Sequence, residues 1–365
     1  MNYIIRLRYS VRFTPNHRTI LLAIEKKTNM IAKLDIPRQE SAIQVIDISP
    51  WLDPQATTKA RQAVIEALHF SCRTHGFFSL VGHGVSLDLQ RQVLGCAETF
   101  FDMPMEDKMA VSMAKSMGMS NRGYEVLRGQ TLQPDALPDL KEIGAEVAAE
   151  DSRAGKFLHG PNMWPSSLEK SDFQAPLMEY LSRLTRVAEL LLEMLRQALP
   201  NPPSEDLFKE FQEKPSTNLR LLHYPPQVSF DERQLGAGAH TDFGGFQTEC
   251  HDRSPVLTFA QPGAPGLEVW HPHTSTWIPV PAVEDHLVVN IGDLLNLWTN
   301  GYFLSAVHRV INRAPTDRYS APFFYNGNTA CNFSPLDMGL GPINTTVQTV
   351  EGHILGKLKA TREKT

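Results

Sequence analysis

The amino-acid sequence predicts an α-rich first half followed by a mainly β second half that folds as a β-sandwich or jelly roll. Apolar residues of the first half recur at helical spacing, most extensively over residues 172–199. After residue 215 the chain changes to short apolar and β-branched runs separated by turn residues, a pattern typical of sandwiches and jelly rolls. A chain of 365 residues is long enough for such a fold with added helices.

The expected elements of the first half are delimited by periodicity and by prolines and glycines at their ends. A strand is expected at 43–52, where apolar and polar residues alternate, and a short buried strand at 76–85 between glycines. Helical spacing predicts helices at 54–75 and 87–101. A further helix is expected at 104–113, which opens with a proline, a residue that suits the first helical turn.

The middle of the chain is less regular. Residues 118–167 are rich in Gly, Pro and polar residues, and we expect a long irregular stretch in which residues 121–127 are ordered. The helix at 172–199 follows and ends at LPNPP, because prolines stop helices. We interpret this helix as a scaffold beneath a sheet.

Eight strand-like segments make up the β-rich half. They are NLRLLHYP, GAGAHTDF, VLTFAQP, GLEVWHP, TWIPVPAV, HLVVNIG, AVHRVIN and RYSAPFFYN. Their short length, regular spacing and intervening turn residues indicate a sandwich or jelly roll.

Composition and charge are those of a globular protein. Hydrophobic residues make up 42% of the chain and charged residues 21%, and the net charge of −5 gives no reason to expect nucleic acid or an anionic membrane as a partner. The four cysteines lack C-x-x-C spacing, which argues against a disulfide framework and a structural zinc site. No apolar run is long enough to span a bilayer, so we expect a soluble, cytoplasmic protein. The sequence does not predict its oligomeric state.

The N-terminal segment has its own composition. Residues 1–29 are basic and contain Glu25 as their single acidic residue, and arginines interrupt each apolar patch, so a secretory signal is not expected. Mitochondrial targeting segments share this composition. We favour the other interpretation, a flexible extension over residues 1–40.

His240 and Asp242 are the first candidates for a metal site. In an extended chain residues i and i+2 project to the same face, so an imidazole and a carboxylate converge there. One more imidazole, which His308 of the strand-like segment SAVHRVIN can supply, completes the set of two histidines and one carboxylate typical of non-heme Fe(II) oxygenases. The other candidate histidines lie in expected turns or solvated ends, and we interpret them as structural or surface residues: His251, His271, His273 and His286.

Arg318 and Ser320 are candidates for binding a carboxylate. They form another i, i+2 pair ten residues after His308, and a planar guanidinium beside a hydroxyl suits a carboxylate group. Together with the metal ligands, this pair predicts a site for an anionic, chelating co-substrate. By the same alternation Phe324 shares the face of Ser320 and Pro322, where it would form an apolar wall or pack in the core, and we favour core packing.

The ordered set of motifs resembles the Fe(II)- and 2-oxoglutarate-dependent dioxygenases of the isopenicillin N synthase-like family. The resemblance starts from H-T-D, H-R-V and R-x-S and extends over residues 40 to 335. The further segments that agree, in order, are VIDISPWL, THGFFSLVGHGV, NRGYEVL, DLKE, HGPNMWP, LRLLHYPP, GAHTDFG, GLEVW, VVNIGDLLNLWTNGYFLSAVHRV and RYSAPFFYN.

The resemblance implies a double-stranded β-helix, or jelly roll, with an α-rich N-terminal region. It divides the chain into the extension at 1–40, an α-rich region at 41–200, the jelly-roll core at 201–340 and a C-terminal tail at 341–365.

The resemblance also implies the cofactors and the reaction. His240, Asp242 and His308 would hold Fe(II), and Tyr224 would join Arg318 and Ser320 in binding 2-oxoglutarate as co-substrate. With O₂, and with ascorbate as a reductant, the enzyme would hydroxylate, desaturate or cyclise a small organic molecule and release succinate and CO₂. Such enzymes often serve fungal secondary metabolism.

Two departures from the family pattern bear on the site. The stretch at 244–255 is interposed after Asp242, and three explanations are open: a substrate-covering loop, a segment that disturbs the site, or an error in the gene model. It also brings Cys250 and His251, which we do not favour as extra ligands. The region at 142–145 is shorter than usual, next to the expected substrate cavity.

Three other functions remain open from the sequence. An oxidase resembling isopenicillin N synthase would use Arg318 and Ser320 to bind the carboxylate of its own substrate instead of 2-oxoglutarate. A member of the fold without catalytic activity would bind a ligand or partner. A zinc hydrolase with the same three ligands is less favoured, because it leaves Arg318 and Ser320 without a role.

Overall fold

The computed structural model describes residues 42–133, 136–149, 153–227, 231–242, 256–260, 262–263, 265–272, 274–343 and 346–362. The expected N-terminal extension and the interposed stretch at 244–255 lie outside these ranges.

The first half contains the expected helices and strands in the expected order. They are β1 (Val45–Asp47), α2 (Ser49–Leu52), α3 (Thr58–Thr74), β2 (Phe77–Val81), α4 (Leu87–Phe101) and α5 (Met105–Ala110). The expected strand at 43–52 is partly wrong, because its second half forms the short helix α2. Pro50 lies in the first turn of that helix, where a proline needs no backbone donor.

The stretch at 118–167 is more ordered than its composition predicts. It contains β3 (Glu142–Ile143) and β4 (Val147–Ala148), which pair antiparallel with β6 (Leu222–Tyr224) and β5 (Ser216–Leu219). These strands are too short to give a periodic signal. Partners about 75 residues away hold them in place, a contact that local sequence does not reveal.

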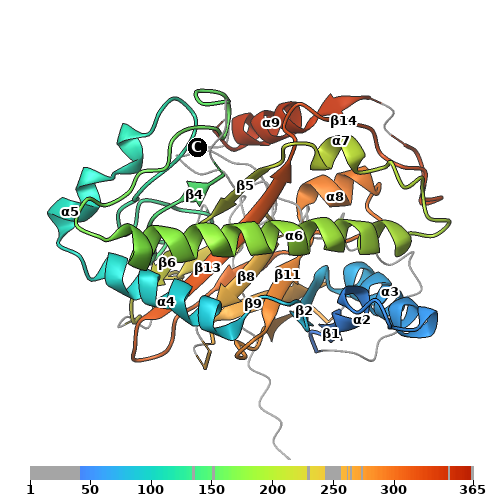
Figure 1. Ribbon diagram of the computed structural model, residues 1–365, viewed down its shortest axis with the longest axis horizontal. Helices are drawn as coiled ribbons and strands as arrows, with labels where there is room; N and C mark the ends of the chain where they lie inside the picture. Colours follow the sequence, from blue (N-terminus) through green and yellow to red (C-terminus); the bar gives the residue numbers. More distant parts are fainter. Residues whose placement is uncertain are drawn as a thin grey trace, which may run out of the picture.

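The longest helix is α6 (Ala175–Gln197), which confirms the helix expected at 172–199. A single π-helical turn, η2 (Lys170–Gln174), leads into it, and the 3₁₀ turn η1 (Met113–Lys115) and helix α7 (Lys209–Gln212) lie before and after. Figure 1 shows α6 crossing the face of the large sheet, with α4 alongside it. Its apolar face is buried, as expected of a scaffold helix: Leu177, Leu181, Leu184, Ala188, Leu191 and Leu195.

The β-rich half forms two sheets. Its strands are β5, β6, β7 (Ala237–His240), β8 (Val256–Ala260), β9 (Leu267–His271), β10 (Thr276–Pro279), β11 (Leu287–Asn290), β12 (His308–Val310) and β13 (Arg318–Gly327). The large sheet follows the order β1-β2-β11-β8-β13-β5-β4, with β6 also paired to β13. The small sheet has the order β10-β9-β12-β7. Residues of both sheets line one cavity, which therefore lies between them.

Four further elements, after residue 292, have no counterpart among the sequence expectations. They are α8 (Asp293–Trp298), β14 (Asn332–Phe333), β15 (Gln348–Thr349) and α9 (Val350–Arg362). The tail expected at 341–365 thus contains a helix, whose Val350 and Ile354 are buried in the main core. That core unites residues from Ile46 to Ile354, and the boundaries drawn at 200 and 340 stay a prediction.

Two further expectations concern the described residues. Cys72, Cys96 and Cys331 are buried free thiols. Among the helices of the described ranges, none has the length and apolar character needed to cross a bilayer.

A polar cluster around His223 joins strands β3 and β6 to Asp317, the residue before β13. The His223 Nδ1 atom lies 2.7 Å from the Glu142 carboxylate and its Nε2 atom lies 2.7 Å from the Asp317 carboxylate. Glu142 also accepts a 2.6 Å hydrogen bond from the Tyr124 hydroxyl. Burial acts to lower the pKa of His223, but the hydrogen bonds with the two carboxylates outweigh it and raise this pKa above its usual value.

The His223 cluster predicts a stability that depends on pH. Because the folded-state pKa of His223 is raised, its stabilisation is fully present below the unfolded-state pKa of about 6.5 and is lost as pH rises through the folded value. We expect His223→Gln to lower the unfolding free energy on the order of 1 kcal/mol near pH 6, since one of the partners is half exposed.

The measurement is denaturant unfolding of the wild type and the variant at several pH values. The difference between them should shrink toward pH 9. A difference that stays constant from pH 6 to 9 would show that the charge of His223 does not contribute.

Candidate metal and co-substrate site

Two neighbouring strands bring the three expected metal ligands together. His308 of β12 lies directly opposite His240 of β7 in the antiparallel pairing, and the ring centroids are 4.3 Å apart. The Asp242 Oδ1 atom is 3.9 Å from the Nε2 atom of His240 and 3.7 Å from that of His308. In the described part of the chain, these residues form the one group of three metal-ligating side chains, with ligand atoms within 4.8 Å of one another.

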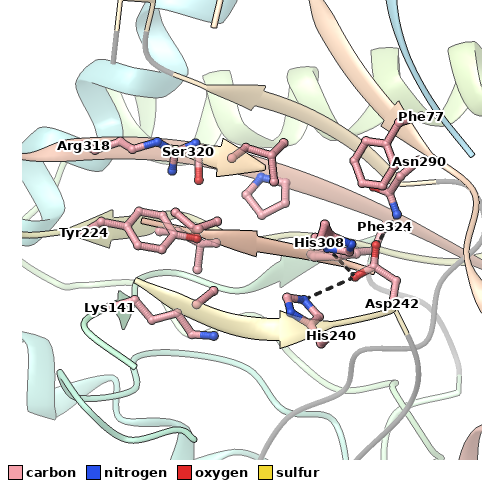
Figure 2. A pocket seen from close by; sticks show the side chains of 15 residues that line it. Phe77, Lys141, Tyr224, His240, Asp242, Asn290, His308, Arg318, Ser320 and Phe324 are labelled. Atoms are coloured by element: carbon pink, nitrogen blue, oxygen red, sulfur yellow. Dashed lines mark hydrogen bonds and ion pairs between the residues drawn. The ribbon is translucent and has the colours of Figure 1, made fainter. Parts of the chain in front are cut away.

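The i, i+2 spacing of His240 and Asp242 predicted that both residues lie in one strand, but Asp242 lies outside it. Strand β7 ends at His240, and two contacts hold the aspartate beyond it. The Asp293 backbone N–H donates to the Asp242 carbonyl oxygen at 3.2 Å, and the Asn290 side-chain amide donates to the Asp242 Oδ2 atom. The other carboxylate oxygen, Oδ1, faces the two imidazoles (Figure 2).

Strand β7 is an edge strand, and side chains satisfy its outer edge. The Gly238 N–H donates to the Asp139 carboxylate at 2.9 Å, and the Ala239 N–H donates to the Gln133 side-chain oxygen at 3.2 Å. The approach requires a glycine, because a Cβ atom on Gly238 would lie 2.7 Å from the Gln133 backbone nitrogen. This edge thereby fixes the position of His240 at the strand's end.

Both imidazoles present the Nε2 atom to Asp242. The Nδ1 atom of His240 is 2.6 Å from the Gly238 carbonyl oxygen, and that of His308 is 3.2 Å from the Ala306 carbonyl oxygen. A carbonyl can only accept, so Nδ1 carries a proton in each ring, and in a neutral imidazole Nε2 is then the atom with the lone pair. Burial lowers the pKa of His240 well below its usual value, and electrostatic repulsion between the two neighbouring rings lowers it further, which favours the neutral form of His240 that a metal needs.

The candidate carboxylate-binding residues lie in the same cavity. Arg318 and Ser320 share one face of β13, and Tyr224 lies directly opposite Arg318 on β6. The Arg318 guanidinium is 2% exposed and lies over the Tyr224 ring, 4.9 Å from its centroid. Burial lowers the pKa of Arg318, while Tyr224 acts to raise it. Arginine remains charged under such conditions, so the cavity contains a fixed positive charge.

The cavity has an empty volume of about 640 Å³, which includes space open to solvent. Phe324 lines it together with Ser320, so the alternation predicted for β13 is confirmed and the wall interpretation is favoured over core packing. The remaining apolar lining residues are Phe77, Leu222, Ala237, Leu267, Val310 and Pro322.

Two polar residues of the cavity were not predicted from the sequence as site residues. Asn290 orients Asp242, and Lys141 lies beside His240 and Tyr224 with its side chain 5% exposed (Figure 2). The segment DLKE contains Lys141, but the sequence alone does not reveal that strand pairing of β3 with β6 carries it into the cavity.

Of the two departures from the family pattern, the structure describes the shortened region at 142–145 but not the stretch at 244–255. Residues 142–145 are buried, and β3 extends the large sheet at this point. Cys250 and His251 fall outside the described residues, so their part as extra ligands stays open. Of the four histidines interpreted as structural, His271 lies outside the metal group, 5.4 Å from the ring of His75, and His286 lies outside it as well.

Family models match most of the two halves. The model of the non-haem dioxygenase in morphine synthesis N-terminal region matches residues 43–167, and that of the 2OG-Fe(II) oxygenase superfamily matches residues 215–327.

Curated relatives cover nearly the full chain. The 2-oxoglutarate-dependent dioxygenase tropC of Talaromyces stipitatus is 40% identical over 87% of this chain and 97% of its own length. The 2-oxoglutarate-dependent dioxygenase caaD of Aspergillus niger is 36% identical over 90% of this chain and 94% of its own. Clavatol oxidase claD of Penicillium crustosum is 36% identical over 87% and 96%.

A solved structure agrees with the fold. A full-length Neurospora crassa protein, solved in complex with alpha-KG and thymine, superposes with a TM-score of 0.72 and 26% identity, covering 89% of this chain and 99% of that one. The two-sheet architecture is accordingly the jelly roll of this superfamily. The chain belongs to the 2OG-Fe(II) oxygenase superfamily, in its isopenicillin N synthase-like class, and is a non-heme Fe(II) 2-oxoglutarate-dependent dioxygenase.

Proposed function

We propose that His240, Asp242 and His308 hold the ferrous ion, and that Arg318, Ser320 and Tyr224 bind the distal carboxylate of 2-oxoglutarate. The observation that carries this assignment is that both groups line one cavity, with the buried guanidinium on β13 and the three ligand atoms clustered at β12 and the end of β7. Two neutral imidazoles and one carboxylate are the donor set that Fe(II) takes in oxygenases, leaving positions for co-substrate and O₂.

The chain's own residues prepare the site in three ways. The carbonyls of Gly238 and Ala306 hold the imidazoles in the tautomer that binds metal, and the Asn290 amide orients the Asp242 carboxylate. Arg318 provides a planar fork of donors at a fixed position. The bound iron and 2-oxoglutarate supply the oxidising chemistry, in which O₂ is consumed and succinate and CO₂ are released.

We propose a small organic molecule as substrate, oxidised by hydroxylation, desaturation or cyclisation, in fungal secondary metabolism. The curated relatives are fungal 2-oxoglutarate-dependent dioxygenases, one of them named for the oxidation of clavatol. The metal ligands do not select among the three outcomes, because all follow from the same oxidation at a C–H bond. Ascorbate as the reductant that maintains the ferrous state and a cytoplasmic location belong to the same proposal.

Anaerobic spectroscopy tests the assignment. Fe(II) and then 2-oxoglutarate are added to metal-free protein, and a weak visible charge-transfer band should require both additions. We expect His308→Ala to abolish the band, because one of the two imidazoles is lost. His271→Ala is the matched control, since His271 lies on the neighbouring strand β9 outside the metal group, and it should retain the band.

The other outcomes separate the alternatives. Iron binding without a band on addition of 2-oxoglutarate would favour the oxidase that binds its own substrate through Arg318. Absence of iron binding in the wild type would contradict the metal assignment.

The Asn290 contact predicts a graded loss of iron affinity. Asn290→Leu removes the donor that orients Asp242, and partners of this kind contribute about 10- to 100-fold to metal affinity. Anaerobic titration with Fe(II) should therefore give a dissociation constant raised by about that factor. Asn326→Leu is the control, because Asn326 is equally buried but donates to Asn218, which does not line the cavity. An unchanged Fe(II) affinity in Asn290→Leu would show that Asn290 does not support metal binding through Asp242.

A further inference from the structure

Lys141 is the polar residue of the cavity that the metal and co-substrate assignments do not use. Among the described lining residues, the other polar side chains are the three metal ligands, the three carboxylate-binding residues and Asn290. Lys141 immediately precedes β3, whose pairing with β6 sets its backbone next to the strand of Tyr224. Figure 2 shows its ammonium group between Tyr224 and His240, along the wall of the cavity.

A salt bridge holds the Lys141 ammonium in this position. Its Nζ atom lies 3.2 Å from the Asp139 carboxylate, and Asp139 is fully buried. Asp139 in turn accepts the Gly238 N–H, so the pair is attached to the strand that carries His240. An ammonium group has three N–H donors, and a lysine so anchored can donate to a ligand while keeping its carboxylate partner.

With Fe(II) and 2-oxoglutarate bound, the formal charges in and beside the cavity sum to zero before a substrate enters. Lys141 is matched by Asp139, and Arg318 and Asp242 carry opposite charges. A ferrous ion and the 2-oxoglutarate dianion also cancel. An anionic substrate would therefore add an uncompensated charge to a buried site, which is costly, whereas a neutral oxygen accepts a hydrogen bond from an ammonium without adding charge.

The rest of the wall is apolar. The residues that form it come from strands of both sheets: Phe77, Leu267, Val310, Pro322 and Phe324. Such a wall fits a compact hydrocarbon body, and a single polar contact then fixes its orientation.

We propose that Lys141 determines substrate specificity, selecting a neutral, largely apolar molecule that presents a ketone or phenol oxygen to its ammonium group. This inference rests on the proposed function, because it assumes that the metal and 2-oxoglutarate occupy the positions assigned above. It adds the chemical class of the substrate and the residue that recognises it.

The test uses three probes of nearly equal shape: acetophenone, α-methylstyrene and benzoate. The first two differ in a carbonyl oxygen against a methylene group, and benzoate replaces the methyl group with a charged oxygen. Each is titrated anaerobically into the protein loaded with Fe(II) and 2-oxoglutarate, and the perturbation of the charge-transfer band gives its dissociation constant. We expect acetophenone to bind about tenfold more tightly than α-methylstyrene, because a hydrogen bond to a charged donor contributes this much. Benzoate should bind more weakly than acetophenone.

Variants assign this preference to Lys141. Lys141→Met should bind the ketone and the hydrocarbon equally while its affinity for 2-oxoglutarate stays within about twofold of the wild type. The double variant Asp139→Asn/Lys141→Met leaves no buried carboxylate unpaired. It replaces Lys141→Met in the same measurements if the single variant fails to fold. Lys108→Met is the matched control, because Lys108 is also a buried lysine beside a carboxylate, that of Glu142, but does not line the cavity. It should keep the wild-type preference.

Several results would overturn the inference while leaving the proposed function intact. They are a charge-transfer band with no response to any probe, equal binding of ketone and hydrocarbon in the wild type, tightest binding of benzoate, and a preference that survives in Lys141→Met. A loss of 2-oxoglutarate affinity above tenfold in Lys141→Met would assign the residue to the co-substrate instead. Absence of the band itself in the wild type would mean that the proposed function fails, and the inference with it.

Discussion

The antiparallel pairing of β7 with β12 is the constraint on which the site depends. It sets His240 opposite His308 and brings their rings within 4.3 Å of each other, and Asp242 needs two further residues of chain to reach them. Strand β7 has a sheet partner on one side, and on the other the Asp139 and Gln133 side chains occupy its edge. A shift of this strand by one residue would turn His240 away from the cavity.

The same edge links the metal ligands to the substrate side of the cavity. Asp139 accepts a backbone donor from β7 and also holds the Lys141 ammonium, so one buried carboxylate positions a metal-ligand strand and a charged wall residue. Burial raises the pKa of Asp139 above its usual value, although Lys141 and the backbone N–H groups of Gly238 and Leu132 act to lower it. These partners therefore favour the charged carboxylate against the effect of its burial.

Periodicity and spacing in the sequence were sufficient to predict much of the fold and the candidate site. The apolar repeat of α6 and the alternation along β13 depend on local geometry, which the sequence carries directly. The spacing of His240 and Asp242 identified the right pair of residues, although β7 ends at His240 and contacts from Asn290 and Asp293 place the aspartate. Asn290 and Lys141 could not be found in this way. Each reaches the cavity through pairing between distant strands, and a lone asparagine or lysine gives no periodic signal. Strands β3 and β4 were not predicted for the same reason, because pairing with distant strands forms them.

Iron K-edge X-ray absorption of the anaerobic Fe(II)-loaded protein tests the central claim most directly, because it counts the ligand types at the metal. The pairing of β7 with β12 predicts two imidazoles and oxygen donors, with no sulfur neighbour. A sulfur scatterer or a third imidazole would contradict this claim. It would mean that Cys250 or His251 joins the metal, and that His240, Asp242 and His308 are not the complete set of protein ligands.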